Sequence, residues 1–131
     1  RLQIGPKMNL GDVEGGAVPK MCMISPPLKD GICHTRTFIP YKCHSAIGVL
    51  GAVSAATAAI IPGTVAEGIA TVPAGASKTL SVEHPSGEFS INLHVDEQAD
   101  PPQVLKAGLL RTARLLSRGE LYVPEHIFIT E

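Results

Sequence analysis

Residues 42–63, KCHSAIGVLGAVSAATAAIIPG, form a nearly uncharged run of small and branched apolar residues that starts with reactive groups and ends at Pro62-Gly63. The length and alanine content favour a helix over a strand, and we predict a helix from about 43 to 60. At ~1.5 Å per residue it would be about 27 Å long, the width of a small domain. Because every face is apolar, we expect other elements to surround this helix. The run is shorter than the ~20 apolar residues of a membrane span, and Lys42 and His44 stand at its start, so we expect no membrane partner.

The composition indicates one domain with an aliphatic core. The chain has 131 residues, of which 44% are hydrophobic and 18% charged, and its net charge is −1. This charge balance gives no sign of a nucleic-acid surface, so small molecules or another protein surface are the expected partners. Three cysteines and no visible signal peptide fit reduced thiols in a cytoplasmic protein.

Apolar segments on both sides of the helix predict strands. The compact apolar run of residues 19–25 is typical of a buried strand, residues 32–39 alternate as a second strand, and residues 78–84 and 88–95 alternate as a hairpin closed by His84-Pro85-Ser86-Gly87. Residues 1–18 read as loop with a helical turn near 7–13. The apolar spacing in residues 104–116 fits either a helix or a strand.

Three groups with chemical potential stand where the helix is expected to begin, namely Cys43, His44 and Ser45. Free backbone amides and the positive end of the helix dipole would bind a carboxylate there and lower a thiol pKa. The alternative is structural: Ser45 or His44 caps the helix, and Cys43 is a small buried hydrophobe. The residues alone leave both interpretations open.

Two further positions have both a functional and a structural interpretation. Arg36 lies in the strand before the helix and either pairs with an acidic residue or binds a ligand carboxylate through its guanidinium fork. Ser86 is either part of a plain hairpin turn or helps the turn amides to hold an anion. A zinc site is disfavoured, because no C-x-x-C is present and adjacent strand residues such as Cys33 and His34 point to opposite faces. We therefore predict no metal.

Four segments together resemble a known enzyme family. These are the Pro19-Lys20 pair, RTFIPYKCHSAIGVLGAVSAATAAIIPGTV from residue 36, EHPSGE from residue 83, and LLRTARLLSRGELYVP from residue 109. They are similar to the C-terminal half of the 4-oxalomesaconate tautomerase and 2-methylaconitate isomerase family, which has the diaminopimelate epimerase fold. The resemblance implies an α+β half-domain in which a curved, barrel-like, mostly antiparallel sheet wraps round one apolar helix. It also implies strands at about 104–112 and 120–123 in place of a C-terminal helix.

The resemblance further implies an activity. Family members move a proton within the allylic system of unsaturated di- or tricarboxylates without a cofactor, as in the degradation of aromatic compounds. Their lysine and cysteine that transfer the proton belong to the N-terminal half. In this chain Cys43 stands at the position of the second cysteine of diaminopimelate epimerases and is the catalytic candidate. The expected carboxylate-binding residues are Arg36, Lys42, His44, Ser45 and Ser86.

We therefore expect residues 1–18 to be a connecting segment and residues 19–131 a C-terminal domain whose N-terminal half is missing. The expected ligand is a di- or tricarboxylate, with no cofactor, and the isolated chain should be inactive. It should pair with an N-terminal half or self-associate. The alternative is a non-catalytic anion-binding module or inactive remnant of the same fold.

Overall fold

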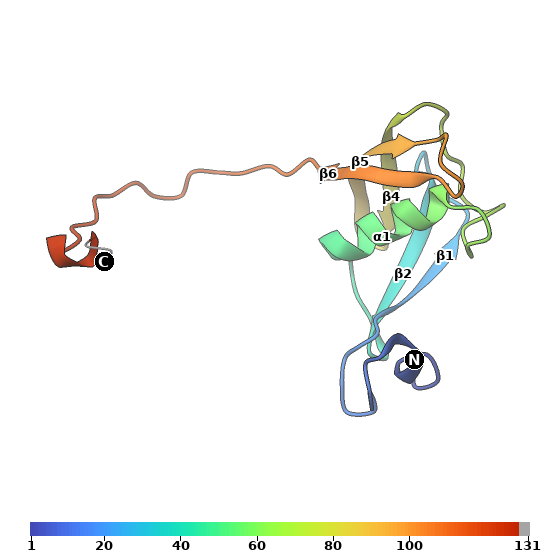
Figure 1. Cartoon of the computed structure of the whole chain (residues 1–131), viewed down its shortest axis with the longest axis horizontal. Helices are drawn as coiled ribbons and strands as arrows, with labels where there is room; N and C mark the ends of the chain where they lie inside the picture. The colour runs from blue at the N-terminus through green and yellow to red at the C-terminus, as the bar shows by residue number, and fades with distance from the viewer. Residues whose placement is uncertain (129–131) are drawn as a thin grey trace.

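The computed structural model describes residues 1–128 and shows an α+β arrangement of one helix on a six-stranded sheet (Figure 1). The helix α1 is preceded by three strands and followed by three, and a short 3-10 helix lies near each end. The elements in chain order are η1 (Pro6–Met8), β1 (Met21–Ser25), β2 (Cys33–Ile39), β3 (Lys42–Cys43), α1 (Val49–Ile60), β4 (Ser77–His84), β5 (Gly87–Asp96), β6 (Gln103–Leu109) and η2 (Glu125–Phe128). The predicted fold class is confirmed.

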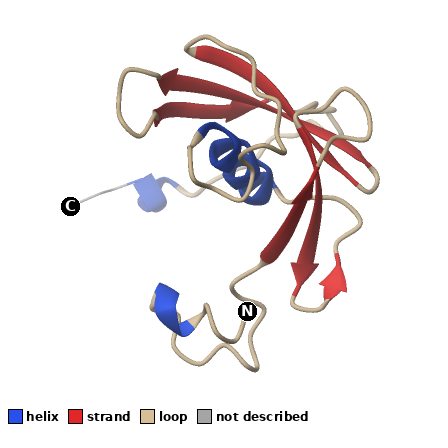
Figure 2. Cartoon of the chain, turned by 90° about the vertical axis from the view of Figure 1, so that its right-hand side faces the viewer, coloured by secondary structure: helices blue, strands red, loops and turns tan. Residues whose placement is uncertain are grey.

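The strands lie in the order β1-β2-β4-β5-β6. The short strand β3 pairs with the last two residues of β2, on the same edge of β2 as β4. Every neighbouring pair is antiparallel except β2 and β4, which run parallel. The β4–β5 hairpin confirms the alternation read from residues 78–95. Figure 2 shows the sheet bending around α1, and the sheet stays open, with β1 and β6 at its two edges.

The core lies between α1 and the inner faces of β4 and β5. Alanines 52, 55 and 56 of the helix are buried, and their small side chains let the helix backbone approach the sheet closely. They pack against branched residues that alternate along the strands: Leu80, Val82, Ile91, Leu93 and Val95. No helix among residues 1–128 has the length and hydropathy needed to cross a membrane.

The predicted start of the helix at residue 43 is wrong. Lys42 and Cys43 instead pair with Ile39 and Phe38 as β3, and α1 begins at Val49 after the extended residue Gly48. The apolar run continues N-terminally of Val49 as far as Ala46, but the backbone groups of 42–43 are paired with β2 in the sheet. The helix therefore begins six residues later than predicted, after the β2–β3 ladder and the extended residue Gly48.

The expectation that other elements surround the helix is also wrong for the described residues. Leu50 is 81% exposed and Val49 is 40% exposed, because the sheet covers only one flank of α1. The barrel-like sheet of the prediction is curved but not closed. An apolar flank of the helix therefore faces solvent.

The C-terminal prediction is correct only in its first part. The strand expected at 104–112 is present as β6 but ends at Leu109, and residues 120–123 form no strand. A strand needs a neighbour to pair its backbone groups, and residues 110–124 pair with no strand among those described. They extend away from the body (Figure 1). At the other end, the helical turn expected near 7–13 is the shorter η1.

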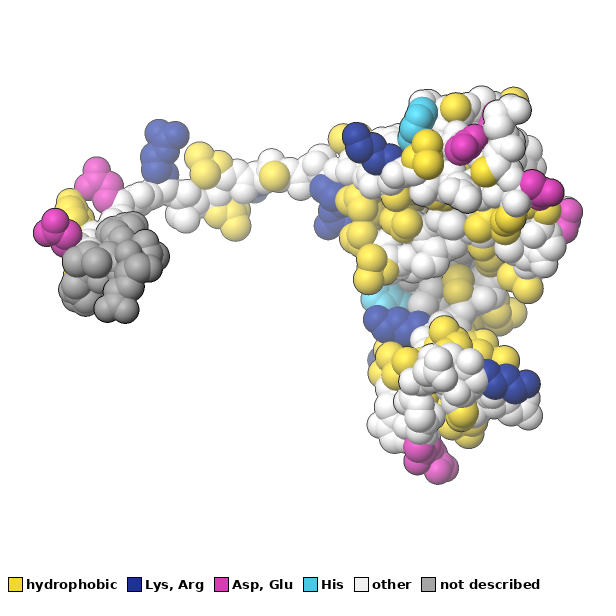
Figure 3. Space-filling model, viewed as in Figure 1, with side chains coloured by type: hydrophobic (Ala, Val, Ile, Leu, Met, Phe, Trp, Pro, Cys, Tyr) yellow, Lys and Arg dark blue, Asp and Glu magenta, His cyan; other side chains and the backbone are white. Residues whose placement is uncertain are grey.

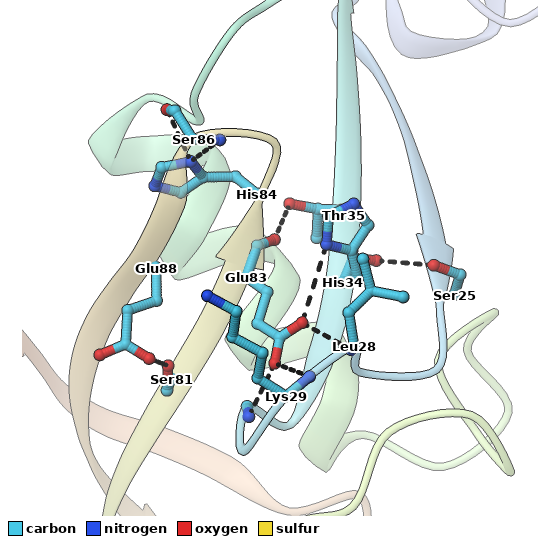
Figure 4. Close-up of polar contacts among 11 residues, drawn as sticks. Ser25, Leu28, Lys29, His34, Thr35, Ser81, Glu83, His84, Ser86 and Glu88 are labelled. Carbon is cyan, nitrogen blue, oxygen red and sulfur yellow. Dashed lines mark hydrogen bonds and ion pairs between the residues drawn. The ribbon is translucent and has the colours of Figure 1, made fainter.

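A buried carboxylate fixes the loop between β1 and β2. Glu83 is 4% exposed, and its carboxylate accepts hydrogen bonds from the amides of Leu28 (2.7 Å), Lys29 (2.9 Å) and Gly31 (2.9 Å) (Figure 4). A Cβ at Gly31 would lie 2.6 Å from Glu83 Cγ, so glycine permits this approach. Burial alone would raise the pKa of the Glu83 carboxyl, but the three amides and nearby His34 lower it below its ordinary value of 4.5.

We predict that Glu83→Gln lowers the free energy of unfolding by about 3 kcal/mol at pH 7, because buried amides lose a charged acceptor. Since the folded-state pKa lies below the unfolded one, the wild type should lose this contribution as pH falls below about 4.5, and the variant should not. Urea unfolding at pH 7 and pH 3.5 measures both effects. Glu88→Gln, an exposed change on the same hairpin, is the control and should cost less than about 0.5 kcal/mol. Equal effects of the two substitutions would contradict the role of Glu83.

Candidate functional site

A groove of about 700 Å³ lies between the strands β1 and β2 and the first two turns of α1. Much of its wall is apolar, and the polar groups gather where the helix begins. The lining residues are Val18, Lys20, Cys22, Ile24, Thr37, Ile39, His44, Gly48, Val49, Leu50, Gly51, Ser54, Ala55 and Ala58. This combination of an apolar wall and a few polar groups is typical of small-molecule sites.

The start of α1 gives the groove a positive end. Gly48 is the N-cap residue, without a side-chain cap, and the first helical bond runs from Ala52 N to Gly48 O at 2.9 Å. The amides of the first turn therefore have no partners within the helix. Residues 48–51 line the groove, so the dipole of the helix favours a negative group there.

His44 is the predicted site residue that lines this groove. Its backbone amide donates to Thr37 O at 2.8 Å, and its Nδ1 accepts from the amide of Ala46 at 2.9 Å. These two contacts fix both the backbone and the ring. The half-buried imidazole is thus held at the mouth of the groove beside the helix start.

The other predicted residues do not line the groove. Lys42 and Ser45 are exposed, and Cys43 is half-buried, with its Sγ 3.5 Å from His44 O. Arg36 is exposed on β2, on the face opposite Thr35 and Thr37. Ser86 lies in the β4–β5 turn, where its Oγ is 3.3 Å from His84 Nδ1 (Figure 4). Lys42, Cys43, His44 and Ser45 are close to one another because they are neighbours in the sequence. Arg36 lies apart from the groove.

Sequence analysis missed four polar residues of the groove, namely Lys20, Cys22, Thr37 and Ser54. Thr37 Oγ1 lies 3.5 Å from Cys22 Sγ, because residues 22 and 37 are partners in the β1–β2 ladder. Alternation along residues 20–24 could have placed Lys20 and Cys22 on one face, but only the register shows which residues of β2 they meet. Within residues 1–128 no group of three or more His, Cys, Asp or Glu side chains is arranged to hold a metal ion.

The arrangement of the helix and the curved sheet resembles part of a solved structure. The solved structure of methylitaconate-delta-isomerase is similar to the chain with a TM-score of 0.61 at 17% identity, over 84% of this chain and 35% of that one. Residues 1–124 match the family described as PrpF protein, so the chain belongs to the PrpF family.

Two curated relatives are much closer in sequence. The chain is 51% identical over 119 residues to the 4-oxalomesaconate tautomerase of Pseudomonas putida, covering 91% of this chain and 32% of that protein. It is 54% identical over 123 residues to the (4E)-oxalomesaconate Delta-isomerase of Novosphingobium sp., covering 94% of this chain and 34% of that protein. The chain therefore spans about a third of the length of these relatives.

We predict that the three thiols react in a fixed order. Cys22 is exposed, Cys43 is half-buried and Cys33 is buried. Burial, with smaller effects of Cys22 and Glu83, raises the pKa of Cys33 to about 11, so its thiolate is scarce at neutral pH. Iodoacetamide at pH 7.5 should label Cys22 first, Cys43 more slowly and Cys33 only after unfolding, as measured by peptide mass spectrometry. Early labelling of Cys33 in the folded protein would contradict the burial order.

Proposed function

We propose that this chain is the substrate-binding C-terminal part of a cofactor-independent isomerase. The reaction moves a proton within the allylic system of an unsaturated di- or tricarboxylate such as 4-oxalomesaconate. The observation that carries the proposal is the identity of 51–54% to two oxalomesaconate isomerases, across a chain whose groove ends at a helix N-terminus. Amide-rich helix ends suit substrates with several carboxylates.

The chemistry requires two functions. A base must remove a proton from the carbon next to a carbonyl or carboxylate, and donors must stabilise the negative charge that spreads onto oxygen before the proton returns at the other end. The start of α1 and His44 supply donors. We propose that the lysine and cysteine implied by the family resemblance supply the proton transfer from the rest of the protein, with Cys43 as a further candidate.

The remaining predicted residues stay in the proposal as outer contacts. Lys42 and Ser45 flank His44 and are exposed, and Ser86 contacts His84 in the neighbouring turn. Arg36 could reach a carboxylate only from the other face of β2, so it contributes to the electrostatic field or to a contact made by the rest of the protein.

We predict that the isolated chain does not isomerise 4-oxalomesaconate above the uncatalysed rate, because it lacks the proton-transfer pair. Adding the N-terminal two-thirds of the Pseudomonas putida tautomerase should restore turnover, measured by the absorbance change of the dienol. The N-terminal piece with its catalytic lysine changed to alanine is the control and should restore nothing. Turnover by the chain alone would contradict the proposal, and ligand binding without restored turnover would favour the anion-binding remnant.

Exposed apolar side chains indicate a partner surface. Leu50 on α1, Met23 on β1 and several residues of the tail are more than half exposed, and Figure 3 shows apolar side chains along the tail. The tail residues are Leu110, Leu115, Leu116, Leu121 and Tyr122. We propose that the rest of a longer protein covers this surface, and that copies of the isolated chain cover it by self-association.

We predict that the isolated chain self-associates in sedimentation velocity at micromolar concentrations. Leu50→Gln should weaken this association at least about tenfold, since burying a leucine contributes roughly 1.5–3 kcal/mol. Leu28→Gln is the matched control, because Leu28 is 74% exposed on a loop outside the groove. A monomer at all concentrations, or equal effects of the two substitutions, would contradict the proposed surface.

A further inference from the structure

Two histidines have the same local hydrogen bond. His44 follows β3 and His84 ends β4, and in each the ring Nδ1 lies within hydrogen-bonding distance of the backbone amide two residues later. The distance from His44 Nδ1 to Ala46 N is 2.9 Å. The distance from His84 Nδ1 to Ser86 N is 3.3 Å, a contact drawn in Figure 4. A backbone amide can only donate, so each Nδ1 is an acceptor and the proton of the neutral ring sits on Nε2. Both rings therefore present an N–H donor away from their own turns.

The two histidines lie along the same edge of β2. His44 N donates to Thr37 O, while Glu83, next to His84, pairs with His34 and accepts at its carbonyl from Thr35 Oγ1 at 2.7 Å. The contact points at residues 35 and 37 are two residues apart, which is roughly 7 Å along a strand. The backbones of the two histidines therefore lie close together along this edge of β2.

The topology brings both rings to the end of the sheet where α1 begins. β2 and β4 are parallel and joined through α1, so their carboxyl ends and the start of the helix lie at the same end. His84 shares the face of β4 that carries Leu80 and Val82 toward α1, and His44 lines the groove.

A positive charge lies at the same end. The Arg111 guanidinium carbon is 5.4 Å from the centre of the Phe89 ring, and Phe89 pairs with Val82, two residues before His84. Arg111 therefore adds to the attraction for an anion. Glu88 is directed to the opposite face, where it accepts from Ser81.

We propose that His84 is a second carboxylate-binding residue and that His44 and His84 bind two carboxylates of one substrate through their Nε2–H groups. The inference rests on the proposed function for its substrate class. His84 was not among the residues that the sequence singled out, because His84-Pro85-Ser86-Gly87 reads as an ordinary hairpin turn. Neither ring is the base of the reaction, since Nδ1 is occupied by an amide and Nε2 carries the proton.

Asparagine and glutamine separate the two roles of each ring. Asparagine places its amide oxygen near the position of Nδ1 and so keeps the turn bond, but it loses the outer donor. Glutamine places its NH2 near the position of Nε2 and so keeps the donor, but it loses the turn bond. The affinity of the full 131-residue chain for cis-aconitate, measured by calorimetry, reports whether the outer N–H donor is present. The thermal melting temperature reports whether the hydrogen bond within the turn is present.

We expect His44→Asn and His84→Asn each to weaken cis-aconitate binding about tenfold or more, the loss of one hydrogen bond to a charged group, with little change in melting temperature. His84→Gln should keep affinity within about threefold while melting lower. His94→Asn is the control, because His94 is exposed and its Nδ1 contacts Ser77 on β4. Nitrogen NMR of the wild-type imidazoles should show the proton on Nε2 and a shift of both rings on titration.

Three results would overturn the proposal. These are no binding of cis-aconitate by the wild-type chain, unchanged affinity in both asparagine variants, or a neutral imidazole of either histidine that carries its proton on Nδ1. These readouts need no catalysis. If binding depends on both histidines but the reconstituted protein shows no turnover, carboxylate binding by His44 and His84 is supported and the proposed isomerase function is contradicted.

Discussion

The parallel contact between β2 and β4 is the interaction on which the rest of the structure depends. It consists of only two residue pairs, Cys33 with Val82 and His34 with Glu83, yet it joins the β1–β2–β3 unit to the β4–β5–β6 unit. Polar contacts reinforce it, because Thr35 donates to the carbonyl of Glu83 while the Glu83 side chain holds the loop before β2. A parallel pair requires a crossover, and here the crossover is α1. The position of the helix start at the carboxyl ends of both strands follows from that connection.

The same constraint explains why the groove is open. The alanine face of α1 is used by β4 and β5, and the sheet ends at β1 without reaching the opposite flank of the helix. A helix that is apolar on every side has more surface to bury than these strands cover. Leu50 and the extended tail are left in solvent, and the chain covers about a third of its curated relatives. The proposal that the rest of a longer protein covers this surface accounts for both observations.

Sequence periodicity predicted those parts of the fold that depend on local pattern. Residues 32–39 and the hairpin of residues 78–95 alternate with period two, and both are present. The apolar run of residues 19–25, predicted as a buried strand, forms the strand β1, but most of its residues are exposed. The helix start could not be found in this way, because small apolar residues suit a turn, a two-residue ladder and a helix equally. Buried charged residues could not be predicted from the sequence either. Lys78 is 6% exposed and donates to Pro73 O and Glu97, but the residues around it in the sequence have the pattern of an exposed strand end. Groove residues such as Cys22 and Thr37 depend on register, which sequence alone does not define.

The hydrogen bonds at the helix start bear on which role these groups have in the proposed proton transfer. A base must hold a free lone pair close to carbon, whereas the groups that stabilise the developing enolate must donate. The Nδ1 lone pair of His44 is taken by the amide of Ala46, and the first-turn amides of α1 can only donate. The imidazole of His44 and the first-turn amides of α1 are therefore suited to bind and stabilise negative charge. In the proposed reaction the groove holds the substrate, and the proton is carried by a group with a free lone pair on another part of the protein or by a thiolate at Cys43.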